Sequence, residues 1–119
     1  MHGLSKEVNL TFLKAKQLEL ICFAAYSIYL HFDDKIIITI EGAFQHSIQG
    51  NKTQSLKCTF PLVGSNLMRL LTQKVKEVRN QSDGTLELDF SNGDVLIIYG
   101  DNGPYEAYHI KHGEHVITV

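Results

Sequence analysis

Apolar and polar residues alternate with a period of two along most of the chain, a pattern typical of β-strands. The clearest case is the segment 85–110, where two alternating runs flank the dipeptide Asn92-Gly93. Asn-Gly favours a type I′ hairpin turn, because Asn tolerates positive φ and Gly adopts it freely. With these two residues as the loop, one face of the hairpin is apolar and becomes the predicted core face: Leu86, Leu88, Phe90, Val95, Ile97 and Tyr99.

A similar hairpin is expected over residues 26–41. A two-residue loop at Asp33-Asp34 would place Phe32 opposite Lys35, whereas a three-residue loop at 33–35 places Phe32 opposite Ile36. The three-residue loop gives a uniform apolar face and is therefore preferred. The other face then carries Tyr29 and His31 among its more polar residues.

Further strands are expected at 16–23, at 74–80 with a bulge, and in a last hairpin of 105–110 and 115–119 turned at His112-Gly113. In that last hairpin, Lys111 would face Glu114 across the turn as an opposite-charge pair. The segment 43–59 is polar and has two interpretations, a loop or one more hairpin turned at Gly50-Asn51.

One helix is expected at about 63–73, after Pro61 and with Ser65 as its N-cap. Leu67, Leu70 and Leu71 repeat at helical spacing and would pack on the sheet.

The two halves of the chain resemble each other in pattern, since each reads as strand, turn, strand, turn, strand. This likeness indicates either a duplication or simply two similar meanders. The predicted fold class is therefore α+β: two three-stranded antiparallel meanders, a C-terminal hairpin and the helix at 63–73. The length predicts a single domain over 1–119, with 1–9 as a loose N-terminal arm.

Composition narrows the classes of function. Hydrophobic residues make up 44% and charged residues 20%, the net charge is −2 and the pI is about 6.3. Without a basic patch, nucleic-acid binding has no electrostatic support. The longest nearly apolar run, 21–30, is about half of the ~20 residues that a membrane span needs. No signal peptide is expected at the N-terminus, and Cys22 and Cys58 read as buried free thiols, so a cytoplasmic location is expected.

The sequence offers candidate chemistry only in weak form. His109, His112, Glu114 and His115 are dense enough to suggest zinc, but the predicted hairpin points them apart. Aspartates gather at turns, where they serve turn geometry. The sequence therefore predicts no catalytic residue, no metal site and no cofactor.

Several stretches of strand and turn residues together resemble a family of small, uncharacterised bacterial proteins: 21–23, 30–34, 38–46, 70–71, 84–96 and 105–110. The likeness runs from about Leu13 to Val119 and includes the patterns L-x-L-x-F, N-G and Y-E-x-Y. It implies a bacterial cytosolic sheet domain and supplies no active site to transfer. By class and size alone, such domains also look like the immunity proteins that neutralise bacterial toxin domains.

The function expected from these features is that of a non-enzymatic protein-binding module, in particular an immunity protein that occludes a toxin domain. Tyrosines and acidic residues on less buried strands suggest the partner contacts: Glu41, His46, Tyr105 and Glu106. Two alternatives stay open. One is a small-molecule or nucleotide-binding domain with a pocket lined by Cys22, Tyr29 and His31, and the other is a structural homodimer paired through a strand edge.

Overall fold

The structure is a computed structural model, and it describes residues 9–50, 52–58 and 65–119. The strands within these ranges are β1 (Leu18–Phe23), β2 (Ile28–Phe32), β3 (Ile36–Ile40), β4 (Ala43–Ile48), β5 (Lys52–Lys57), β6 (Val75–Asn80), β7 (Leu86–Phe90), β8 (Val95–Ile98), β9 (Tyr108–His112) and β10 (His115–Thr118). One short 3-10 turn precedes the strands of each half: η1 (Thr11–Leu13) in the first half and η2 (Leu67–Leu70) in the second.

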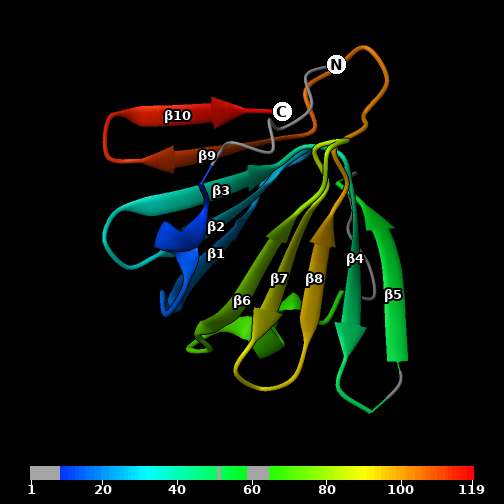
Figure 1. The fold of residues 1–119 in the computed structure, drawn as a ribbon. Coiled ribbons are helices and arrows are strands. Elements are labelled where there is room, and N and C mark those ends of the chain that lie inside the picture. Colours follow the sequence, from blue (N-terminus) through cyan, green and yellow to red (C-terminus); the bar gives the residue numbers. More distant parts are fainter. Residues whose placement is uncertain (1–8, 51, 59–64) are drawn as a thin grey trace.

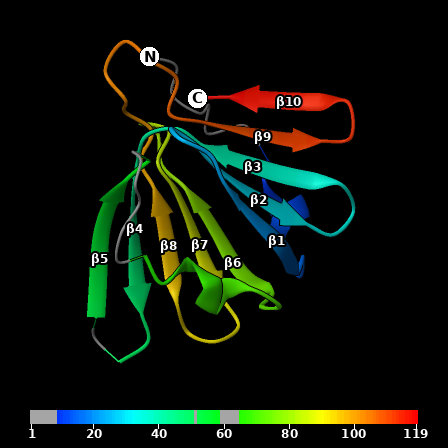
Figure 2. The same ribbon diagram turned by 180° about the vertical axis from the view of Figure 1, so that it is seen from behind.

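The strands form two five-stranded antiparallel sheets (Figures 1 and 2). The first sheet has the order β1-β2-β3-β9-β10, and the second has the order β5-β4-β8-β7-β6. The chain passes between the sheets after β3 and again after β8. Both passages lie at one corner, from which the sheets fan out (Figure 1).

The two halves of the chain follow the same course and exchange their last hairpins. In each half a 3-10 turn leads into a three-stranded meander, β1-β2-β3 or β6-β7-β8, and then into a hairpin. The hairpin β4-β5 joins the meander of the second half through β8, and the hairpin β9-β10 joins that of the first half through β3. The repeat seen in the sequence is therefore present in the structure, and each sheet contains strands of both halves.

The halves meet through matching hydrogen bonds. The N–H of Ala15 donates to the carbonyl oxygen of Val75, and the N–H of Thr72 donates to that of Leu18, both at 2.8 Å. Ala15 and Thr72 are equivalent in the two halves and both have positive φ, 68° and 70°. This backbone conformation turns the chain out of the 3-10 turn and into the first strand of each meander.

The apolar core lies between the inner faces of the two sheets. In the first sheet one inner row crosses all five strands and is wholly apolar: Ile21, Leu30, Ile38, Ile110 and Ile117. Leu88 and Leu96 continue the core on the second sheet, and both are fully buried. Removing these side chains from water is the main stabilising term for such a fold.

The expectation of an α+β fold was wrong, since the described part of the chain contains no α-helix. In the range 63–73, where a helix was predicted, the structure has only η2, and residues 63 and 64 lie outside the described part. Leu67 and Leu70 are buried as expected, but a 3-10 turn is enough to place them on one side. Leu71 is already extended, with φ −60° and ψ 135°. No helix among the described residues is long and apolar enough to cross a membrane.

The three-residue loop of the first hairpin is confirmed, because Phe32 lies opposite Ile36. The two-residue loop at Asn92-Gly93 is wrong. The N–H of Phe90 donates to the carbonyl oxygen of Asp94 at 2.8 Å, so this loop also has three residues. As a result, Asp94 and Leu96 face the core. Val95, which was predicted to face the core, lies on the outer face of the sheet.

The remaining segments show one confirmation and one shift of register. The hairpin interpretation of 43–59 is correct and gives β4 and β5, with residues 51 and 59 outside the described part. In the last hairpin the loop lies one residue further on than expected, so Val116 rather than Glu114 faces Lys111. The predicted loose arm, 1–9, falls outside the described residues except for Asn9.

Candidate functional site

The outer face of the first sheet carries two rows of side chains that are largely apolar or uncharged. The strand registers place one row across the sheet as Leu20, His31, Ile37, Lys111 and Val116. The neighbouring row is Cys22, Tyr29, Thr39, His109 and Thr118. None of these ten residues is acidic. Leu20 is 50% exposed and Val116 59%.

The outer face of the second sheet has a different character. Its two rows are Glu77, Asp89, Val95, Ser47 and Thr53, and Arg79, Glu87, Ile97, Gln45 and Ser55. Arg79 donates to both Asp89 and Glu87, so these two rows carry one cation and three carboxylates. Four of these ten residues are charged and two, Val95 and Ile97, are apolar, so most of this face is well solvated. The face of the first sheet instead leaves Leu20 and Val116 in contact with water.

At one end of the first sheet's outer face, three side chains that can bind a metal meet. Glu41 follows β3, Glu106 precedes β9 and His109 lies on β9. The Nε2 atom of His109 lies 2.5 Å from a carboxylate oxygen of Glu41 and 3.1 Å from one of Glu106. On the other side of the ring, Nδ1 lies 3.1 Å from the hydroxyl of Thr118.

A hollow of about 360 Å³ adjoins this group and shares Glu41 with it. Its lining comes from the corner where the chain changes sheet: Glu41, Gly42, Ala43, Lys57, Cys58, Asp101, Asn102 and Gly103. Burial raises the pKa of the Cys58 thiol to about 12. This thiol is therefore protonated at neutral pH and is neither a nucleophile nor a good metal ligand.

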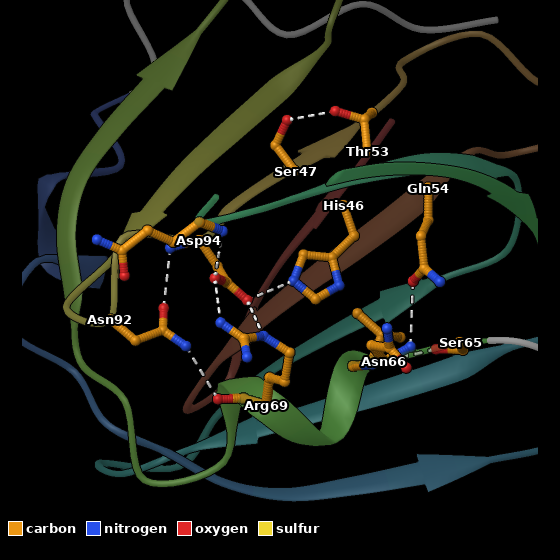
Figure 3. Close-up of polar contacts among 11 residues, drawn as sticks. His46, Ser47, Thr53, Gln54, Ser65, Asn66, Arg69, Asn92 and Asp94 are labelled. Atoms are coloured by element: carbon orange, nitrogen blue, oxygen red, sulfur yellow. Dashed lines mark hydrogen bonds and ion pairs between the residues drawn. The ribbon is translucent and has the colours of Figure 1, made fainter. Parts of the chain in front are cut away.

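A second polar cluster lies between the sheets and is centred on Asp94, which is 0% exposed (Figure 3). Arg69 of η2 donates to both carboxylate oxygens, from Nε at 3.0 Å and from Nη2 at 2.9 Å. His46 of β4 contacts the same carboxylate through Nε2 at 2.7 Å, and the backbone N–H of Gln49 donates to it at 3.0 Å. Four nitrogen atoms from three residues therefore surround one buried carboxylate.

This environment keeps Asp94 ionised. Burial alone would raise the pKa of Asp94, but hydrogen bonds from Arg69, from the backbone of Gln49 and from His46 outweigh it. The pKa consequently lies well below its ordinary value of 3.8. Asn92 extends the cluster, because its side chain accepts from the N–H of Asp94 and donates to the carbonyl oxygen of Arg69.

The imidazole of His46 completes the cluster on the side of β4. It is 0% exposed, and within the described residues no group hydrogen-bonds to its Nδ1 atom. Its cross-strand neighbour, Gln54, accepts a hydrogen bond from the N–H of Asn66 at 3.2 Å (Figure 3). The arrangement is suited to holding η2 against the second sheet.

The four contact residues predicted from the sequence fall in different places. His46 is buried and cannot touch a partner, so its prediction as a surface contact is corrected. Its position in β4 alternates with outward-facing neighbours, and no local pattern indicated its buried partner Asp94. Glu41 and Glu106 come together around His109, and Tyr105 beside them is 72% exposed. Their role in binding a partner stays a prediction.

Comparison with known proteins gives a family. Residues 11–119 match the model of a family of unknown function, DUF6188. The chain belongs to this family. The DUF6188 match begins at η1 and covers both halves, so the exchange of hairpins lies within one family unit. No curated protein and no solved structure matches the chain.

Proposed function

We propose that this DUF6188 protein is a non-enzymatic protein-binding module whose interface is the outer face of the first sheet. The observation that carries the proposal is the contrast between the two outer faces. Both sheets have the same strand arrangement, yet one outer face is charged and solvated while the other exposes Leu20, Tyr29 and Val116 around Ile37. Aliphatic and aromatic side chains in one patch are typical of interface centres.

The charge of this face indicates the chemistry of the partner. The two rows contain one cation, Lys111, and no carboxylate, so a partner with an apolar centre and a carboxylate opposite Lys111 is complementary. Tyr105, Glu41 and Glu106 at the end of the sheet would add contacts at the periphery. In its specific form, the proposal is that the partner is a toxin domain in the cytoplasm and that binding occludes its active surface. The free thiols Cys22 and Cys58 support the reducing compartment that this form assumes.

Site-specific photo-crosslinking tests the interface. A photoreactive phenylalanine analogue replaces Val116 on the first sheet or, as the matched control, Thr53 on the outer face of the second sheet. Both positions lie on outward rows of edge strands, and both are exposed. In cells that produce the protein naturally, we expect one partner to crosslink from position 116 and not from position 53. Equal crosslinking from both positions, or none from either, would overturn the proposal, and crosslinking to a second copy of the chain would replace it with a homodimer.

Affinity measurements then test the chemistry. Leu20→Glu and Val116→Glu place negative charge on the proposed face, and each should weaken binding of the crosslinked partner at least tenfold. Thr53→Glu and Ser55→Glu on the other sheet should leave the affinity unchanged. If the partner is a toxin domain, the wild-type protein should inhibit its activity and Val116→Glu should inhibit it less. Loss of binding in both sets of variants would place the interface elsewhere.

A further inference from the structure

We propose that Glu41, Glu106 and His109 hold one divalent cation of the zinc class at the end of the first sheet. One oxygen of each carboxylate and one nitrogen of the imidazole lie within 4.8 Å of one another. A tetrahedral zinc ion with bonds of about 2.0–2.2 Å separates its ligands by roughly 3.4 Å, so small side-chain rotations suffice. Of the four residues considered as a zinc cluster from the sequence, His109, His112, Glu114 and His115, only His109 belongs to this group.

The approach of two carboxylates to the same nitrogen supports the presence of a cation. The Nε2 atom of His109 can carry only one proton, yet oxygens of Glu41 and Glu106 both lie within 3.1 Å of it. Two carboxylates that share a site repel each other. A divalent cation between them removes this repulsion and uses the lone pair of the nitrogen.

The hydroxyl of Thr118 supplies the outer contact that a metal-bound histidine requires. It lies 3.1 Å from Nδ1 of His109 and can accept a hydrogen bond from that nitrogen when Nδ1 is protonated. With the proton on Nδ1, the lone pair of Nε2 points toward the two carboxylates. Histidine ligands of metals are usually oriented in this way by a second hydrogen bond.

The donor set selects the class of cation. Calcium and magnesium prefer six or more oxygen ligands, whereas one imidazole and two carboxylates suit zinc and related transition metals. Three protein ligands leave a position open, and the adjoining hollow of about 360 Å³ shares Glu41 with the group. Water or a partner's side chain can occupy that position.

Binding would join segments that are distant in the chain. Glu41 comes from the first half, and Glu106 and His109 come from the second. Asn102 already holds the segment before β9 by donating to the carbonyl oxygen of Glu106 at 2.8 Å. A cation would add a link between this segment and the end of β3, beside the proposed interface.

Calorimetric titration of metal-depleted protein with zinc chloride tests the site. We expect one zinc per chain and a rise in the melting temperature. Glu41→Gln and His109→Ala should each lower the affinity at least tenfold, and Thr118→Val, which removes only the outer contact, should lower it by about tenfold. Glu114→Gln and His115→Ala are matched controls on the β9-β10 hairpin and should bind as the wild type does. Magnesium and calcium should bind more weakly than zinc.

Two results would overturn the proposal. One is the absence of any zinc binding by the wild-type protein. The other is binding that survives Glu41→Gln and His109→Ala but is lost in His115→Ala, which would assign the metal to the hairpin tip. Because a variant can fail for reasons of folding, the ¹⁵N shifts of the His109 ring are also followed in the wild-type protein. Zinc should move the Nε2 signal of His109, and a spectrum that stays unchanged would contradict direct coordination.

Discussion

The two sheets differ most clearly at three positions that are equivalent by strand register and turn geometry. In the first sheet and its 3-10 turn these positions are apolar: Phe12, Ile36 and Ile110. In the second they form the polar cluster: Arg69, Asp94 and His46. Phe12 stacks on His112 with ring centroids 4.5 Å apart, whereas Arg69 donates two hydrogen bonds to Asp94.

The difference shows what each kind of contact can specify. Burying Ile36 and Ile110 stabilises the sheet without fixing a direction, because apolar contacts are non-directional. Asp94 needs donors at defined places, and His46 on β4 supplies one of them. Since the halves are similar, the hairpin β4-β5 could in principle pair with either meander. We infer that the polar cluster selects the correct pairing, because of the two hairpins only β4-β5 carries a side chain, that of His46, which hydrogen-bonds to Asp94.

The largest expected effect comes from Asp94→Asn. The amide nitrogen of Asn would face a hydrogen-bond donor whichever way the side chain turns, because both oxygens of Asp94 accept from donors. We expect a loss of about 3–5 kcal/mol in the free energy of unfolding, measured by urea denaturation. Ile36→Val, the equivalent position on the apolar side, should cost only about 0.5–1.5 kcal/mol. Equal losses at the two positions would contradict the comparison.

The next test replaces the polar cluster of the second sheet with the apolar residues found at the equivalent positions of the first. The triple variant Arg69→Phe, His46→Ile and Asp94→Ile places in the second sheet the residues of the first. Replacing a buried ionic cluster by apolar residues is often neutral or stabilising by about 1–4 kcal/mol, so this variant should be at least as stable as the wild type.

The triple variant should also lose uniqueness of pairing. We expect extra peaks in its amide NMR spectrum, or dimers formed by exchange of hairpins in light scattering. A stable, monomeric variant with one set of peaks would show that the cluster does not select the pairing.

Much of the sheet structure could be read from the sequence, because alternation of apolar and polar residues fixes which side of a strand is buried. In the first hairpin, only the three-residue loop places Ile36, Ile38 and Ile40 on the same face as the apolar residues of β2, so the register could be predicted. The second hairpin was ambiguous, since 95, 97 and 99 are as apolar as 96 and 98. Alignment of the three-residue loop at 33–35 with 91–93 would have resolved it and would have placed Asp94 in the core.

The helix and the sites were harder to predict. The leucine spacing at η2 suits a 3-10 turn as well as an α-helix, and tertiary contacts of Thr72 with the other half end the turn early. His46 and Asp94 are 48 residues apart, and Glu41 and His109 are 68 residues apart. Such pairs arise from the exchange of hairpins between halves, which no local pattern encodes.

The pH dependence of stability gives a smaller and graded effect. The pKa of folded Asp94 lies below its ordinary value of 3.8, so the stabilisation from its charge is complete above that pH and is lost as the pH falls below it. The loss can reach about 1.4 kcal/mol per pH unit for one proton. The triple variant lacks this carboxylate, so its stability should fall less than that of the wild type below pH 3.8. Parallel curves for the two proteins would show that Asp94 is not the group responsible.

The smallest expected effect compares Thr72 with Ala15, the two residues with positive φ where the halves meet. Left-handed backbone is unfavourable for both, and more so for Thr because its β-branched side chain is crowded there. Thr72→Gly relieves this strain but increases the freedom of the unfolded chain, so we expect a net gain of about 0.5 kcal/mol. Ala15→Gly relieves less backbone strain, so its free energy of unfolding should stay close to that of the wild type. A larger gain at Ala15 than at Thr72, measured by thermal denaturation, would mean that the two junctions do not carry the same backbone strain and are less alike than their hydrogen bonds indicate.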